Sequence, residues 1–220
     1  MITVHHLNHS RSQRILWLLE ELELPYEVVR HERDAKTMLA PASLRAVHPL
    51  GKAPVITDDG ATIAESGAIL EYLVDTYGKG RMAPTPGTPA WRDYRYFMHY
   101  AEGSLMPYLV MKLVFNRVKT DAPFVVRPIA RAIASTVGKQ FIDPALAAHA
   151  RFVTDHLTQH AWFAGDAISA ADVQMFFAVE GLVARGGADT PPLKAWLAKV
   201  HDRPAFKRAI EKGGPYSIMS

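Results

Sequence analysis

The stretch LGKAPVITDDGATIAESGAI, residues 50–69, decides the fold that we expect for this chain. Pro54 stands inside an otherwise strand-like run, where a proline removes a donor from the ladder and argues against a central strand. A proline at such a place is often a turn-forming cis residue, which leaves neighbouring backbone groups free to meet a ligand. Asp58-Asp59-Gly60 predicts a hairpin turn between two short strands. Glu65-Ser66 then opens a helix, where a carboxylate, a hydroxyl and helix amides meet and suit a ligand with both an ammonium and a carboxylate.

The composition predicts a folded protein of one domain or two small ones. The chain has 220 residues, and 49% of them are apolar. A formal net charge of +3 is too small to indicate nucleic acid or an acidic membrane as a partner. The lack of cysteine excludes disulfides, thiolate-bound metals and a thiol nucleophile, and it fits a reducing compartment. The N-terminal segment does not resemble a signal peptide, and no apolar run approaches the length of a membrane span. We therefore expect a cytoplasmic protein with no membrane partner.

The first eighty residues read as a small mixed sheet with helices. The expected elements are a strand at 2–7, a helix at 15–24 that Pro25 ends, a strand at 26–30, a weak helix at 36–47, strands at 55–57 and 61–64, and a helix at 66–77. The order βαβ–α–ββ–α is that of a mixed sheet covered by helices.

The rest of the chain is helical in pattern. Residues 81–89 are rich in glycine and proline and predict a linker, which divides the chain into domains at 1–80 and 90–220. The expected helices run from Trp91 to Phe115 with a disturbance at Pro107, around 129–137, from 143 to about 160, and near 193–200 and 204–211. Asp143-Pro144 predicts an N-cap followed by proline. Residues 169–172, Ser-Ala-Ala-Asp, predict a capping box with aspartate in place of glutamate.

The turn between the first strand and the first helix is a candidate site because it carries Ser10 and Ser12. Ligands of α/β sheets favour the carboxyl ends of strands, and a helix start adds a positive end and amide donors. Either serine could simply cap the helix. Ser10 is nearer the strand end, so we expect it to be the functional hydroxyl and Ser12 to be the cap, with the reverse left open.

Other candidate residues have structural alternatives. Lys52 is either a solvated lysine or a cation for a ligand carboxylate, and Glu65 and Ser66 can also stabilise the first helical turn. His5 and His6 are adjacent on a strand and face opposite sides, so we expect no metal site there. Glycine-rich nucleotide-binding and hydrolase motifs are absent from the sequence.

Three segments together resemble the cytosolic glutathione S-transferase family, most closely its serine-type bacterial and fungal branch. They are SRSQRILWLLEELELPYEVV, HPLGKAPVI with AESGAILEYL, and WFAGDAISAADVQM. The resemblance implies a thioredoxin-like N-terminal α/β domain, an all-α C-terminal domain, a homodimer and a role in detoxification. It also implies glutathione as co-substrate, with no metal.

The same resemblance implies roles for individual residues. Pro54 would be cis, and the backbone of Ala53 would pair with the cysteinyl part of glutathione. Glu65 and Ser66 would hold the γ-glutamyl end, and Lys52 the glycyl carboxylate. Ser10, or alternatively Ser12, would match the catalytic hydroxyl, which donates a hydrogen bond to the glutathione thiolate. The thiolate is the nucleophile, and it would attack a hydrophobic electrophile.

The electrophile is expected between the domains. Candidates to line its pocket are Met106, Tyr108, Met111 and Phe115, which can equally be ordinary core residues. Glu102, on the same helix, could reach the γ-glutamyl ammonium across a dimer interface. The alternatives to a transferase are a non-catalytic binding or interaction protein on the same fold, and a glutathione-dependent peroxidase or disulfide reductase. A nucleic-acid-binding role lacks a basic stripe.

Overall fold

The computed structural model describes residues 1–215, so the last five residues of the expected second domain lie outside the described part. The N-terminal part contains β1 (Ile2–Leu7), α1 (Ser12–Glu21), β2 (Tyr26–His31), α2 (Ala42–Val47), β3 (Val55–Asp58), β4 (Ala61–Ala64) and α3 (Ser66–Tyr77). The strands form one four-stranded sheet in the order β2-β1-β3-β4. β1 pairs with β2 in parallel and with β3 in antiparallel fashion, and β3 and β4 form the predicted hairpin. This is the expected thioredoxin-like arrangement.

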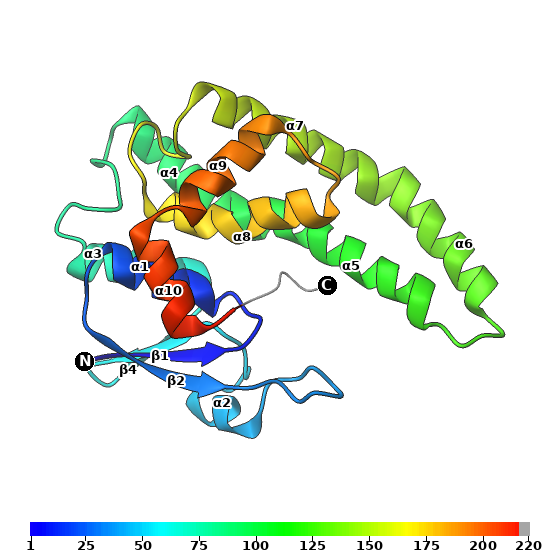
Figure 1. Ribbon diagram of the computed structural model, residues 1–220, viewed down its shortest axis with the longest axis horizontal. Coiled ribbons are helices and arrows are strands. Elements are labelled where there is room, and N and C mark those ends of the chain that lie inside the picture. The colour runs from blue at the N-terminus through cyan, green and yellow to red at the C-terminus, as the bar shows by residue number, and fades with distance from the viewer. Residues whose placement is uncertain (216–220) are drawn as a thin grey trace.

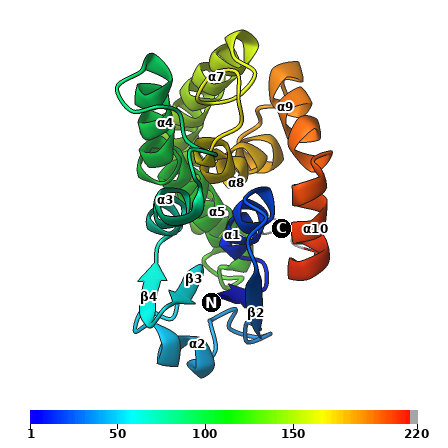
Figure 2. The ribbon, with the colours of Figure 1, turned by 90° about the vertical axis from the view of Figure 1, so that its left-hand side faces the viewer.

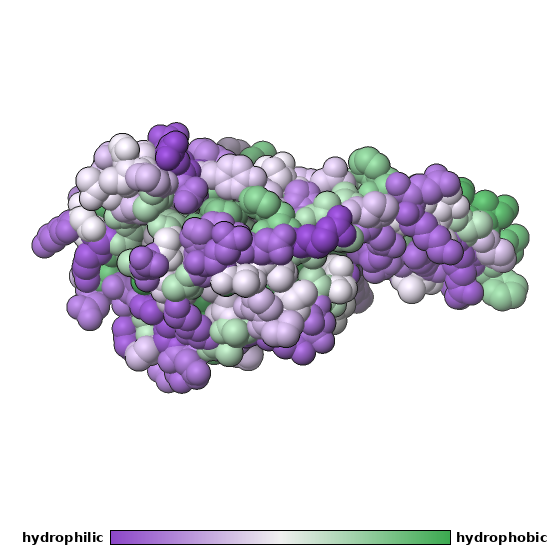
Figure 3. Space-filling view, turned by 90° about the horizontal axis from the view of Figure 1, so that it is seen from above, coloured by the Kyte–Doolittle hydropathy of each residue, from purple (hydrophilic) through white to green (hydrophobic). Residues whose placement is uncertain are grey.

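The second part of the chain is helical and is built largely on two long, interrupted helices. It contains α4 (Pro89–Tyr100), η1 (Ala101–Leu105), α5 (Met106–Asp121), α6 (Arg127–Val137), η2 (Gly138–Ile142), α7 (Asp143–Gln159), α8 (Ala170–Arg185), α9 (Pro191–His201) and α10 (Pro204–Gly213). α5 and α6 form a hairpin that projects from the body of the molecule (Figure 1). The space-filling view from above shows the same projection (Figure 3).

Both interruptions are π-helical turns that precede a proline. η1 ends one residue before Met106-Pro107, and η2 ends one residue before Asp143-Pro144. Proline lacks an N–H and collides with the carbonyl four residues earlier, and a π turn relieves both problems without ending the helix. The predicted disturbance at Pro107 is confirmed. The prediction that Asp143 caps a new helix was wrong, because η2 joins α6 to α7 and Asp143 instead contacts Lys112 through an ion pair.

The predicted helix over 36–47 is shorter than expected. Only Ala42–Val47 is helical, because the Asp34 carboxylate accepts hydrogen bonds from the Lys36 and Thr37 amides and forms a local turn. Pro41 then precedes the short helix in extended conformation.

The two parts share one hydrophobic core. α1 and α3 lie between the sheet and the helical domain, and α2 lies on the opposite face of the sheet (Figure 2). Trp17 of α1 is fully buried and packs edge-on against Phe176 of α8 and Phe206 of α10. α10 therefore returns from the helical domain to cover α1. This continuous packing fixes the orientation of the N-terminal domain relative to α5 and α8.

The predicted capping box at the start of α8 is confirmed. Asp172 is fully buried, and its carboxylate accepts hydrogen bonds from the amides of Phe163 and Ser169, both at 2.9 Å, and from the Ser169 hydroxyl at 3.0 Å. Asp172 thus fixes the loop before α8 as well as the helix start.

Candidate functional site

Two cavities adjoin where the two domains meet. The first, which we call the polar cavity, has a volume of about 590 Å³, and it is lined by residues 52–54 and 64–66 together with Arg11, His48, Leu50 and Glu102. The second, the interdomain cavity, has a volume of about 630 Å³ and lies between the β1–α1 turn and helices α5 and α8. Arg11 and Ala53 line both cavities, so ligands in the two cavities can meet at these residues.

The predicted site residues divide between these cavities. Lys52, Ala53, Pro54, Glu65 and Ser66 all line the polar cavity, and the Ala53–Pro54 bond is cis. Ser10 lines the interdomain cavity beside Ala53. Ser12 is fully buried and is not part of either lining. The fold therefore brings Ser10 to the same cavity as Ala53 of the cis-proline segment, and Ala53 also lines the cavity formed by the start of α3.

The two serines have different environments. The Ser10 hydroxyl accepts a hydrogen bond from the Ser12 amide at 3.2 Å and lies 2.7 Å from the Ser12 hydroxyl. The Ser12 hydroxyl is also 2.9 Å from Nδ1 of His6 and contacts the Leu7 amide and carbonyl at 3.3 Å. The prediction that Ser12 caps α1 was wrong: the cap residue is Arg11, without a side-chain cap bond, and the Ser12 side chain is directed back to the end of β1. The Ser12 hydroxyl is therefore buried and in contact with Ser10.

His6 completes this buried chain of side chains. Burial lowers the pKa of His6 to about 4, and the nearby Arg30 charge contributes a smaller decrease. A hydrogen bond with the Gly213 backbone raises the pKa and offsets part of this decrease. The imidazole is therefore neutral at pH 7, and the Ser10–Ser12–His6 chain contains no charged group under these conditions.

The start of α3 has an unusual backbone. Glu65 precedes the helix with φ 74° and ψ 129°, a conformation that residues other than glycine rarely adopt. Such strain is typical of functional sites, where surrounding structure holds it. Ser66 follows as the first residue of α3 and is buried, with its hydroxyl accepting from Nη2 of Arg14 at 3.1 Å. The strained turn thus directs an exposed carboxylate and a fixed hydroxyl toward the polar cavity.

Arg14 connects the polar cavity to the helical domain. Its fully buried guanidinium donates to Ser66, to the backbone and side-chain oxygens of Gln174 on α8, and to Glu102 at 2.6 Å. Arg11 also contacts Glu102, at 3.1 Å. Although burial acts to raise the pKa of Glu102, the Arg14 and Arg11 charges hold it below its usual value. Glu102 is therefore a fixed anion in the lining of the polar cavity of its own chain.

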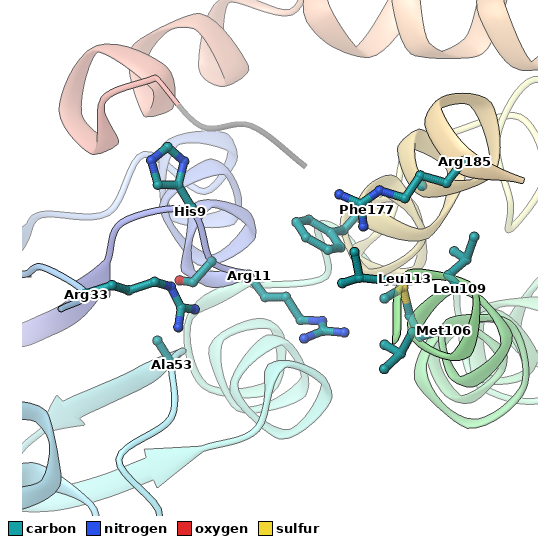
Figure 4. A pocket seen from close by; sticks show the side chains of 12 residues that line it. His9, Arg11, Arg33, Ala53, Met106, Leu109, Leu113, Phe177 and Arg185 are labelled. Carbon is teal, nitrogen blue, oxygen red and sulfur yellow. The ribbon is translucent and has the colours of Figure 1, made fainter. Parts of the chain in front are cut away.

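The interdomain cavity has an apolar wall on the helical side. Met106, Leu109, Val110 and Leu113 line it from α5, and Phe177, Gly181 and Arg185 line it from α8. The close-up shows Arg11 extending from the β1–α1 turn toward this wall (Figure 4). Its guanidinium carbon lies 5.3 Å from the centre of the Phe177 ring.

The predicted lining was right for Met106 and wrong for three other residues. Tyr108, Met111 and Phe115 are half-buried against the core and do not line the interdomain cavity. Tyr108 packs instead against Phe141 and His149 on the opposite side of α5. Residues 106, 109, 110 and 113 share one face of a helix by the 3.6-residue period, whereas 108, 111 and 115 share another. The sequence does not show which of the two faces meets the N-terminal domain.

Sequence reasoning also missed residues that the structure places at the site. Arg11 and Arg14 were not considered as site residues, His6 was considered only as a metal ligand, and the contribution of α8 was not foreseen. One signal was available: Arg11 and Arg14 are three residues apart at the start of α1, so they extend from one face of that helix. Their common partner, Glu102, lies about ninety positions away and was accessible only from the fold.

Comparisons with known proteins decide the family. Residues 10–76 match the N-terminal domain of glutathione S-transferases, and residues 128–213 match the C-terminal domain of the same proteins. The chain belongs to the glutathione S-transferase family. It is 35% identical to glutathione S-transferase 3 of Schizosaccharomyces pombe over 96% of this chain and 88% of that protein. It is 30% identical to glutathione S-transferase 1 of Saccharomyces cerevisiae over 96% of this chain and 95% of that protein.

Solved structures of glutathione S-transferases have the same fold. A glutathione S-transferase from Actinobacillus pleuropneumoniae superimposes with a TM-score of 0.76 at 30% sequence identity, covering 98% of this chain and 94% of that one. A sphingomonad glutathione S-transferase in complex with glutathione superimposes with a TM-score of 0.72 at 22% identity, covering 96% and 98%.

Two further findings bear on the chemistry of this glutathione S-transferase. Across residues 1–215, no cluster of three or more histidine, aspartate or glutamate side chains is arranged to hold a metal ion. In the same part of the chain, no helix has the length and apolar character needed to cross a membrane.

Proposed function

We propose that this glutathione transferase binds glutathione in the polar cavity and uses Ser10 to hold its sulfur as a thiolate. The observation that carries the proposal is the shared position of Ala53, which lines both cavities beside the Ser10 turn. A cysteinyl group paired with the Ala53 backbone would place its sulfur at the entrance to the interdomain cavity. The electrophile would occupy that second cavity, against the apolar faces of α5 and α8.

The charges of the polar cavity match the two ends of glutathione. Glu65, Ser66 and Glu102 offer carboxylates and a hydroxyl for the γ-glutamyl end, and Lys52 offers a cation for the glycyl carboxylate. We propose that Glu102 acts in the polar cavity of its own chain, where Arg11 and Arg14 hold it in place.

Ser10 is arranged to act as a donor. Its oxygen accepts from the Ser12 amide, and either hydroxyl can donate across the 2.7 Å contact with Ser12. The proposal requires Ser12 to be the donor in that contact, so that the Ser10 proton is available to the sulfur. A thiol has a pKa near 8.5, so lowering it by about two units requires roughly 2.7 kcal/mol of preferential thiolate stabilisation. A hydrogen bond to a charged group contributes about 1.5–3 kcal/mol, and the start of α1 adds a helix-end contribution. The Arg11 guanidinium, which lines both cavities, adds a nearby positive charge.

The experiment that tests this proposal follows the ultraviolet absorbance of the thiolate while glutathione is added at neutral pH. Wild-type protein should give a thiolate signal that Ser10→Ala largely removes. Ser12→Ala should reduce the signal less, and Ser104→Ala, an exposed serine outside both cavities, should leave it unchanged. A signal that survives Ser10→Ala and disappears in Ser12→Ala would assign the role to Ser12.

The remaining parts of the proposal follow the same family logic. We propose a cytoplasmic homodimer of the serine type that conjugates hydrophobic electrophiles, with a role in detoxification. A monomeric mass by light scattering would contradict the dimer. Thioether formation, rather than reduction of hydroperoxides or disulfides, would distinguish transferase activity from the alternative reactions. A non-catalytic binding protein would bind glutathione without producing a thiolate signal.

A further inference from the structure

The end of the α5–α6 hairpin is a part of the molecule that the proposed catalytic function does not use. Residues 116–133 comprise the last turns of α5, the connecting loop and the first turns of α6. This end projects away from the sheet and from the other helices (Figure 1). It lies beyond Leu113, the last residue of α5 that lines the interdomain cavity.

Apolar side chains are exposed at this end. Phe124 and Val125 are 84% and 85% exposed, more than any other large apolar side chain in residues 1–215. Val126, Ile129 and Ile133 are between 47% and 63% exposed. Apolar residues gather at the projecting end in the space-filling view (Figure 3). Isolated exposed apolar residues are ordinary, but a cluster at the tip of a projection indicates a contact surface.

The apolar stripe continues along α5 toward the interdomain cavity. Val110, which lines that cavity, is followed at four-residue intervals by Val114 and Val118, and all three are between 38% and 50% exposed. Residues at this spacing follow one side of a helix. The exposed apolar surface therefore connects the tip of the hairpin with the mouth of the cavity.

The excess positive charge of the protein is concentrated at the same end. Residues 116–133 contain four basic residues, Arg117, Lys119, Arg127 and Arg131, and one acidic residue, Asp121. The whole chain has 25 lysines and arginines and 22 acidic residues, so the remaining residues, with 21 of each, are formally neutral. The Nε groups of Arg127 and Arg131 donate to the backbone carbonyls of Ala122 and Lys119, which do not neutralise their charge.

We propose that the hairpin end, residues 116–133, docks on the surface of a bilayer that contains anionic lipids, with Phe124 and Val125 entering the interfacial region. An apolar tip flanked by lysine and arginine is the composition that binds such an interface, where apolar burial and attraction to anionic headgroups add together. A second copy of the chain fits less well, because pairing two hairpin ends would bring two groups of basic residues together. The binding is peripheral and requires no membrane-spanning helix. It replaces the expectation of no membrane partner, which rested on the net charge of the whole chain and not on where that charge is concentrated.

The test is co-sedimentation of the full chain with vesicles of phosphatidylcholine alone or mixed with phosphatidylserine. The wild-type protein should bind the mixed vesicles at least about tenfold more tightly than the neutral ones, and added salt should weaken this binding. The double variant Phe124→Asp/Val125→Asp should lose the binding. The double variant Arg117→Gln/Lys119→Gln should reduce binding to mixed vesicles and leave the weak binding to neutral vesicles unchanged.

The matched control is Leu39→Asp, which changes an exposed apolar residue on the N-terminal domain and should bind like wild type. Circular dichroism and conjugation of a water-soluble electrophile should be unchanged in the hairpin variants, which separates this proposal from the catalytic one. Wild-type protein that does not sediment with either vesicle would overturn the proposal. Vesicle binding that survives Phe124→Asp/Val125→Asp would also overturn it. A dimer that this variant dissociates in the absence of lipid would overturn it too, because the surface would then bind a second copy of the chain.

Discussion

Replacing His6 by asparagine should remove a defined part of the acid sensitivity of this protein. His6 has a pKa of about 4 in the folded protein, mainly because of burial, against an ordinary value of 6.5 in an unfolded chain. Between these values the unfolded state binds the proton more readily, so the free energy of unfolding falls as pH falls. The effect of His6 is fully favourable above pH 6.5 and is lost as pH decreases toward 4.

The size of the effect follows from the same two values. Each pH unit between them costs about 1.4 kcal/mol, so His6 accounts for about 2 kcal/mol of lost stability between pH 7 and pH 5 and about 3 kcal/mol by pH 4. His6→Asn keeps a hydrogen-bonding side chain next to the Ser12 hydroxyl but cannot titrate. The variant should be less stable than wild type at pH 7, and this difference should shrink by about 2 kcal/mol at pH 5.

Urea denaturation of both proteins from pH 7.5 to pH 5 measures this difference. Titrating groups that do not interact with His6 are present in both proteins and cancel in the comparison. His31 is also present in both, and its charge makes only a small contribution to the lowered pKa of His6. Stability curves that run parallel through this range would refute the reasoning, because they would show that His6 is equally easy to protonate in the folded and unfolded states.

Two further predictions concern α8 and α3. Asp172→Ala should lower the free energy of unfolding by about 3–5 kcal/mol, because three hydrogen-bond donors lose a buried acceptor. Chemical denaturation measures this change. A decrease below about 1 kcal/mol would contradict the role of Asp172 in fixing the start of α8. Glu65→Gly should raise the free energy of unfolding by about 1 kcal/mol, because glycine adopts a φ of 74° with less strain. The same variant should bind glutathione more weakly in calorimetry, because the carboxylate is lost. A variant that binds glutathione as tightly as wild type would show that the strained residue 65 does not serve the binding site.

Local sequence signals predicted much of the fold. The β3–β4 hairpin follows from Asp58-Asp59-Gly60, α3 spans the predicted residues 66–77, and the capping box at Ser169 is present as expected. These elements depend on interactions between residues a few positions apart, so their patterns are visible in the sequence. The helix expected over 36–47 was too long because the side chain of Asp34 competes for backbone amides, an effect that apolar periodicity does not record.

The candidate site likewise combines features that follow from local sequence with features that depend on tertiary packing. The sequence by itself determined which residues stand at the cis-proline, at the start of α3 and in the β1–α1 turn, because each of these belongs to a short motif with its own backbone chemistry. Only the tertiary structure decided that Ser12 is buried against His6, that Arg14 joins Ser66 to Glu102, and which face of α5 meets the N-terminal domain. The reason is physical: these contacts join residues on different elements, and they form only after the packing of α1 against α8 and α10 has fixed the orientation of the two domains.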